Sequence, residues 1–145
     1  MTRIDFHTNV PDKLAYACRL ARKAYGARAS LIMLAEDAAQ ARALDAALWT
    51  FSERDFLPHV MAHDPLAERT PIIVCSEEPD PQASHLAHCT LLVNLSTRAP
   101  RDPGRYERVV EIVSSDAADA ACGRQRYSAY KQQCFPLTHF VAGTS

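Results

Sequence analysis

The residues of this sequence that most resemble a metal site are His85, His88 and Cys89, in the segment "HLAHC", with Cys75 earlier in the chain. Imidazole and thiolate groups are ligands that zinc prefers. Their spacing matches no standard zinc finger, and adjacent residues of a strand point to opposite faces of a sheet. The alternative interpretation is a strand with a buried cysteine, preceded by a polar loop.

Asp5 and His7 are a second candidate pair, because both lie in the short segment "RIDFH", which we expect to be the first strand. Residues two apart in a strand share a face, so the pair could act in acid–base chemistry at a sheet edge. The alternative is a capping or solvated role. No GxSxG nucleophile motif occurs. A small α/β enzyme that uses Asp5 and His7, or the His85, His88 and Cys89 cluster, is therefore one of two functional hypotheses.

Glycine usage argues against a conventional nucleotide-binding enzyme. The chain has four glycines, Gly26, Gly104, Gly123 and Gly143, and no two are close enough for GxGxxG or GxxxxGK[ST]. The turn after the first predicted strand, "HTNVPDK", holds none of them. We expect no phosphate-binding loop and no cofactor.

The elements that must position these residues alternate along the chain. We predict strands at 3–7, 30–35, 70–75, 89–95 and within 105–113, helices at 8–26, 36–49 and 116–134, and a short tail at 135–141. The strands at 30–35, 70–75 and 89–95 are nearly all apolar, as in a sheet covered on both faces. This pattern predicts an α/β fold, a three-layer sandwich with a largely parallel central sheet, nucleotide-binding-like but without a phosphate-binding loop.

The first predicted helix carries its own start and stop signals. Thr8 or Asn9 can cap its N-terminus, Pro11 suits its first turn and Gly26 suits its exit. Its expected core-facing residues recur at helical spacing and are Leu14, Cys18, Ala21 and Tyr25.

Composition restricts the remaining possibilities. With 145 residues, 48% of them apolar, the chain is long enough for one domain, 1–145, with a real core. We expect a cytoplasmic protein with reduced cysteines, because no apolar run is long enough to span a membrane and no signal peptide is evident. The net charge of −1 argues against direct nucleic-acid binding. The only residues that support direct nucleic-acid binding are four loop arginines, Arg98, Arg101, Arg105 and Arg108.

The segment "LDAALWTFSERDFLPHV" places large rings where the chain should turn. At about 100° per residue, the core-facing stripe of the second helix holds Ala41, Leu44, Ala47 and Leu48. Trp49 falls roughly 120° away from this stripe. Phe56 and Pro58 follow in a loop that also holds the charges of 53–55. The rings either fold back into the core or form an apolar patch rimmed by charges, which is typical of a protein–protein interface.

The last helix presents a second candidate surface. Arg124, Tyr127, Ser128 and Lys131 lie within about 100° of one another, whereas Arg126 points elsewhere. The stripe is either a solvated helix face or a site for an acidic peptide that carries an apolar side chain or a free carboxylate.

The blocks "LDAALWTFSERDFLPH" and "RQRYSAYK" together resemble the chi subunit of bacterial DNA polymerase III. The resemblance covers most of the chain, including "DFH", "LIMLAEDAAQARALD" and "VVEIV". It implies a non-catalytic accessory protein of the clamp-loader complex. Such a protein forms a heterodimer with the psi subunit and binds the acidic C-terminal tail of the single-stranded-DNA-binding protein. Contact with DNA would be indirect.

Site residues follow from the same resemblance, position by position. Trp49, Phe56 and Pro58 match the psi-facing surface of the family. On the last helix, Arg124, Tyr127 and Lys131 match the tail-binding surface, and Ser128 occupies a further position of that surface. Ser128 stands where well-known members have another basic residue, so the resemblance implies a less cationic tail site.

Overall fold

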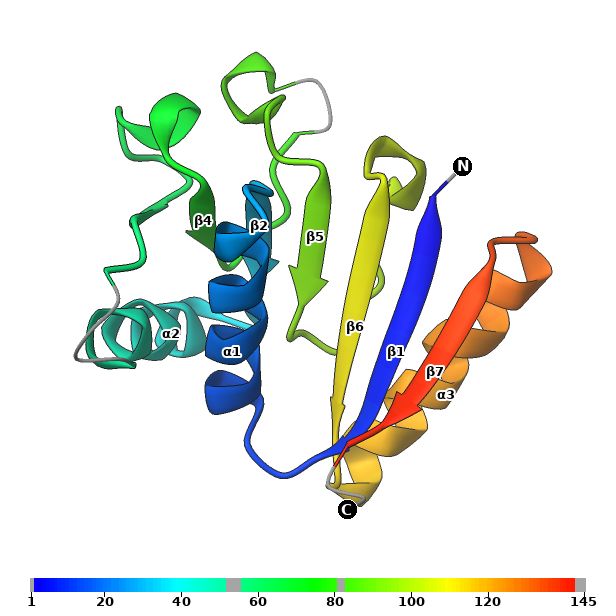
Figure 1. The fold of residues 1–145 in the computed structure, drawn as a ribbon. Coiled ribbons are helices and arrows are strands. Elements are labelled where there is room, and N and C mark those ends of the chain that lie inside the picture. The colour runs from blue at the N-terminus through cyan, green and yellow to red at the C-terminus, as the bar shows by residue number, and fades with distance from the viewer. Residues whose placement is uncertain (1, 52–55, 81–82, 143–145) are drawn as a thin grey trace.

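The central element of the fold is a single sheet of parallel strands. The computed structural model describes residues 2–51, 56–80 and 83–142. Within them, seven strands lie in the order β3-β4-β2-β5-β6-β1-β7 (Figure 1). The strands are β1 (Arg3–Val10), β2 (Leu31–Leu34), β3 (His59–Met61), β4 (Ile72–Cys75), β5 (Leu91–Asn94), β6 (Arg108–Ser114) and β7 (Leu137–Val141). The helices are α1 (Lys13–Gly26), α2 (Ala38–Thr50) and α3 (Ala117–Gln132), with 3-10 turns η1 (Ala67–Arg69), η2 (Ser84–Leu86) and η3 (Pro103–Arg105).

Helices cover both faces of this sheet. The chain runs from β1 through α1, β2 and α2 to β3 in one direction across the sheet, and later connections return in the other direction. Because parallel crossovers are right-handed, the two directions place their helices on opposite faces. Strand β2 shows the result: Leu31 and Met33 pack with the α1 and α2 side, and Ile32 and Leu34 with the α3 side. The predicted three-layer α/β sandwich is confirmed, and the described sheet is parallel throughout.

The boundary between β1 and α1 differs from the prediction. Strand β1 continues to Val10, which is buried and pairs with Ser114 of β6. Asn9 adopts φ 57°, a left-handed conformation that asparagine tolerates, at the irregularity that ends the regular pairing. Asp12 caps α1 by accepting a bond from the Ala15 amide at 3.2 Å. Neither Thr8 nor Asn9 is the cap, because burial of Val10 keeps the chain extended beyond them.

The core-facing side of α1 is also less buried at the C-terminal end of the helix than the periodicity predicts. Cys18 and Ala21 are buried as expected, but Tyr25 is 39% exposed. Helix α2 follows its prediction, with Ala41, Leu44 and Leu48 buried.

The segment 135–141, predicted as a tail, contains a strand. β7 pairs in parallel with β1, from Ile4 opposite Leu137 to Thr8 opposite Val141. Its residues are mostly exposed, because β7 is the outer strand of the sheet. The short strand β3 was also not predicted, and it occupies the other edge.

Candidate binding surfaces

A groove runs between α3 and the strands β1 and β7, with a volume of about 690 Å³. Its floor is apolar, because Phe6 and Val113 contribute their side chains from the sheet. The Tyr127 ring packs edge-on against Phe6, with ring centroids 5.2 Å apart. Arg124 and three polar side chains also line it: Ser128, His139 and Thr8. The groove thus combines an apolar base with a cation.

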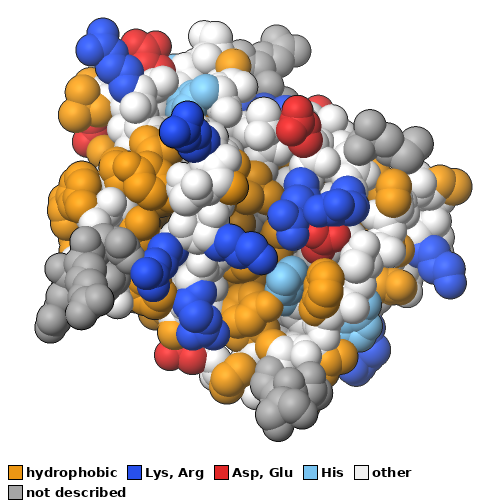
Figure 2. All heavy atoms as spheres, in the orientation of Figure 1, with side chains coloured by type: hydrophobic (Ala, Val, Ile, Leu, Met, Phe, Trp, Pro, Cys, Tyr) orange, Lys and Arg blue, Asp and Glu red, His pale blue; other side chains and the backbone are white. Residues whose placement is uncertain are grey.

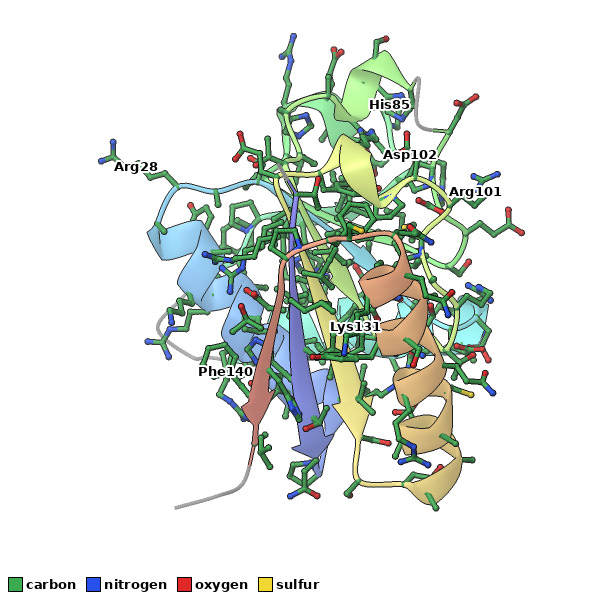
Figure 3. The ribbon with its side chains drawn as sticks, turned by 90° about the vertical axis from the view of Figure 1, so that its right-hand side faces the viewer. Arg28, His85, Arg101, Asp102, Lys131 and Phe140 are labelled. Carbon is green, nitrogen blue, oxygen red and sulfur yellow. The ribbon has the colours of Figure 1, made fainter. Side chains whose placement is uncertain are left out.

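Close packing of α3 on the sheet shapes this groove. Gly123 faces β6, and a Cβ atom there would lie 2.8 Å from Cγ2 of Val113. Real Cβ contacts are longer, and valine is stiff, so only glycine permits this approach. The predicted residues Arg124, Tyr127 and Ser128 therefore come together at the groove. Lys131 is exposed on the following turn of α3 (Figure 3) and does not line the groove.

A buried polar cluster fixes the rotation of α3. Arg126 points inward and its Nε donates to Glu111 Oε1 at 3.1 Å. The Tyr130 hydroxyl donates to Oε2 of the same carboxylate at 2.6 Å, and Asn94 Nδ2 donates to Oε1 at 3.0 Å. Burial raises the pKa of Glu111, and Arg126, Tyr130 and Asn94 act against that rise. Sequence patterns did not predict this cluster, although helical geometry placed Arg126 away from the stripe.

A second surface lies at the end of α2, where Trp49 is 56% and Phe56 is 64% exposed. The two rings lie 5.6 Å apart, and Trp49 also packs on the His59 imidazole at 4.7 Å. His59 Nδ1 donates to the Leu57 carbonyl at 2.7 Å, which holds the ring under the tryptophan. Trp49 is off the core face, as predicted. The supporting role of His59 was missed, although it sits in the quoted "LPH" segment.

The loop between the two aromatic residues is described only in part. The charged residues 53–55 of the predicted rim lie outside the described residues. Leu57 turns into the core and Pro58 is half-buried. The exposed apolar area at this surface therefore comes from Trp49 and Phe56.

The carboxyl-terminal edge of the sheet, where open α/β folds often bind phosphate, holds a cavity of about 610 Å³ that four acidic side chains and two arginines line. The Glu36 carboxylate accepts bonds from Thr97, at 2.6 Å from its amide and 2.9 Å from its hydroxyl. Arg98 donates to the carbonyl groups of Glu36 and Ser76, both at 3.1 Å. The Glu36 carboxylate disfavours a phosphate here, because the two negative charges repel each other.

The pair Asp5 and His7 is engaged within the protein. Asp5 is 1% exposed, and Arg108 Nε donates to it at 2.6 Å. His7 Nδ1 makes a hydrogen bond with the Tyr16 hydroxyl. Burial lowers the pKa of His7. The two side chains make contacts with other groups and do not form an acid–base pair in this arrangement.

Of the cluster His85, His88 and Cys89, His88 and Cys89 come together, with Nε2 of His88 3.6 Å from Sγ of Cys89. His88 Nε2 bonds the Thr70 carbonyl at 2.8 Å, and His85 is exposed in η2. Burial raises the pKa of the Cys89 thiol to about 11, which disfavours the thiolate that zinc needs. Among the described residues, no three His, Cys, Asp or Glu side chains are placed to hold a metal ion.

Comparison with known proteins shows the family of this chain. The family model of the DNA polymerase III chi subunit, HolC, matches residues 1–138. The chain belongs to the chi subunit family of DNA polymerase III. The DNA polymerase III subunit chi of Pseudomonas aeruginosa is 32% identical over 142 residues, which cover 94% of each chain. The chi subunit of Escherichia coli is 26% identical over 120 residues, covering 83% of this chain and 79% of the relative.

Membership of the chi family assigns the chain an accessory role in DNA replication, and not the catalytic role of the polymerase. Of the four arginines expected in loops, Arg108 instead begins β6 and pairs with Asp5, and the other three also bind within this chi subunit. Arg98 bonds backbone carbonyls, Arg101 pairs with Glu78, and Arg105 donates to the Leu86 carbonyl. None of the described helices is long and apolar enough to cross a membrane.

Proposed function

We propose that this chi subunit is an adaptor that links the clamp-loader complex of DNA polymerase III to the single-stranded-DNA-binding protein. One contact would be with the psi subunit, in a heterodimer, and the other with the acidic C-terminal tail of the single-stranded-DNA-binding protein. Such a link needs no chemistry, because it raises the effective concentration of one complex near the other. Its place of action is the cytoplasm, where bacterial chromosomes are replicated.

The groove beside α3 is the observation that carries this proposal. A tail that is acidic and ends in an apolar residue needs an apolar base for that side chain and a cation for its carboxylate. Phe6, Val113 and Tyr127 form the base, and Arg124 lines the same groove. Lys131, one turn further along α3, extends the positive charge toward the acidic residues that precede the end of the tail. Ser128 adds no charge, so binding should depend strongly on Arg124.

The exposed pair of Trp49 and Phe56 supports the second contact. Large aromatic side chains are typical anchors of protein interfaces, and these two already contact each other before a partner binds. Pro58 restricts the backbone next to them, which lowers the entropy lost on binding. We assign this surface to psi, and its distance from the groove would leave both partners bound together.

The deciding experiment measures binding of a fluorescently labelled acidic peptide with the sequence of the tail. Arg124→Ala should weaken binding by about 1.5–3 kcal/mol, the usual cost of losing a hydrogen bond to a charged group. Gln125→Ala, an exposed neighbour on α3, is the matched control. A second peptide that lacks its last two residues should bind no better to wild type than to Arg124→Ala. Equal affinities of wild type and Arg124→Ala for the intact peptide at low salt would exclude the groove as the tail site.

The psi contact is tested separately by co-purification with psi. Trp49→Ala should abolish the heterodimer while the variant keeps its helical circular dichroism and its tail-peptide binding. A folded Trp49→Ala variant that still holds psi would exclude this surface.

A further inference from the structure

Charge is distributed unevenly along this chain. Residues 1–30 hold six of the 16 Lys and Arg residues but only two of the 17 Asp and Glu residues. Helix α1 itself contains four cations and no acidic residue. Figure 2 shows Lys and Arg side chains gathered over α1 and over the strands beside it, with few acidic side chains among them. The net charge of −1 therefore conceals a basic face.

The strands beside α1 are open on this face. In Figure 1, α1 lies over the middle of the sheet, and no described helix covers β1 or β7 on the same side. Three rings form a row here, which we call the aromatic row: Phe140 of β7, His7 of β1 and Tyr16 of α1. Their neighbouring centroids lie 5.1 Å and 5.4 Å apart. Figure 3 shows Phe140 on the α1 side of β7, and its side chain is 52% exposed.

Cations surround the aromatic row. The Arg19 guanidinium stacks over the Tyr16 ring, 5.3 Å from its centroid. Lys23 and Arg108 are close enough to His7 to act on it electrostatically. Arg3 and Arg108 both approach Asp5, whose carboxylate is buried beneath them, while their own side chains remain 56% and 40% exposed. The charge that this part of the surface presents to solvent is thus positive.

The aromatic row also contains an unsatisfied polar atom. His7 is 8% exposed, and no hydrogen-bond partner for its Nε2 exists among the described residues. Buried ring nitrogens normally have a partner. This nitrogen is shielded from solvent, so a ligand on the surface would contact the outer side chains of the row and not this atom.

We propose that the aromatic row and its cations Arg3, Arg19, Lys23 and Arg108 bind single-stranded DNA. Rings flanked by cations match the two repeating groups of a single strand. A base can stack on the exposed Phe140 ring, which packs on the buried His7 ring, and phosphates can pair with the cations. An acidic peptide would use the cations but would leave the row of rings without stacking partners. DNA is favoured over RNA because the chain belongs to a DNA polymerase subunit family. The site includes Arg108, which lies in β6, but it is separate from Arg98, Arg101 and Arg105 and from the α3 groove.

Fluorescence anisotropy of a labelled oligothymidylate of about 12 nucleotides tests this proposal with the full chain. The four cations of the site, less the negative charge of Asp5, amount to about three net positive charges. A plot of the logarithm of the association constant against the logarithm of salt concentration should therefore have a slope near −2. Binding should therefore weaken roughly 15- to 20-fold between 50 and 200 mM salt.

Two variants separate stacking from charge. Phe140→Ala should weaken binding about tenfold and leave the salt slope unchanged, because a stacking contact releases no counterions. Lys23→Ala should weaken binding and make the slope shallower by about 0.7. Both side chains are exposed, so both variants should keep the wild-type melting temperature. The matched controls are Leu66→Ala and Arg69→Ala, exposed residues beside and in η1, which should bind like wild type.

Several results would overturn the proposal. Absence of binding at 20 mM salt would do so, as would equal losses in the η1 controls. An oligouridylate that binds tenfold more tightly than the oligothymidylate would overturn the assignment to DNA. A polyglutamate peptide that binds as tightly as the oligonucleotide would show that the surface recognises acidic peptides.

Discussion

Replacing Glu111 by glutamine tests how the groove beside α3 is held in place. Glutamine keeps the size of the side chain and still accepts hydrogen bonds, but it removes the charge that faces Arg126. Both side chains are almost fully buried, at 0% and 4% exposure. Removing one partner of a buried ion pair costs about 3–5 kcal/mol, because the remaining charge has no compensation.

The consequence for thermal stability can be worked out from chain length. With an unfolding entropy of about 2.1 cal/mol/K per residue, this chain loses roughly 3 °C of melting temperature per kcal/mol. We therefore expect Glu111→Gln to melt about 10–15 °C below wild type. The free energy of unfolding should fall by a large part of the 5–15 kcal/mol that is usual for a domain.

Urea denaturation followed by circular dichroism measures this loss. The double variant Glu111→Gln/Arg126→Leu is the decisive companion, because it removes both charges and should recover part of the stability lost by the single variant. A loss below about 1 kcal/mol for Glu111→Gln would refute the reasoning. So would additive losses in the double variant, since they would show that the two charges are not coupled.

Three further predictions concern packing, pH and the aromatic surface. Gly123→Ala should lower stability by up to about 2 kcal/mol in urea denaturation, because overlap with Val113 outweighs the gain in helix propensity; a stabilised variant would contradict the close packing. Burial alone would raise the pKa of the Asp119 carboxyl, but hydrogen bonds from Lys13 and Ser114 outweigh the effect of burial. They hold this pKa below the ordinary value of an aspartate. The stability lost in Asp119→Asn should therefore be greatest above about pH 4 and disappear as the pH falls through the lowered pKa, and a pH-independent loss would disprove the coupling. Trp49→Ala should cost less than about 1 kcal/mol in the free protein, because the ring is mostly exposed, and a larger loss in the same denaturation assay would reassign Trp49 to the core.

The strands that sequence patterns predicted are the ones buried on both faces. Continuous apolar runs define β2, β4 and β5, and burial at the centre of the sheet explains those runs. The edge strands β3 and β7 lack such runs, because each is short or largely exposed. The start of α1 was misplaced for a related reason. Three residues with capping side chains precede it, and only the pairing of Val10 with β6 decides that Asp12 is the cap.

The candidate sites were predictable where one helix defines them. The angular position of Trp49 on α2 and the stripe on α3 follow from helical geometry alone. The groove was not predictable, because Phe6 and Val113 come from strands that are distant in sequence. Glu111 resembles a surface residue until Arg126 and Tyr130 are placed beside it. The aromatic row likewise requires β1, α1 and β7 to be brought together.

The pairing of β7 with β1 also bears on how the chain is made. Thr8 and His139, which hydrogen-bond across these strands, are separated by 131 residues. At about 5–20 residues per second, a ribosome needs roughly 7–26 s to add the partner of β1 after β1 itself has been synthesised. During that time one edge of β1 has unpaired backbone groups, which favour aggregation with other nascent chains. Synthesis of this protein should therefore depend on chaperones more than that of a fold whose neighbouring strands are consecutive in sequence.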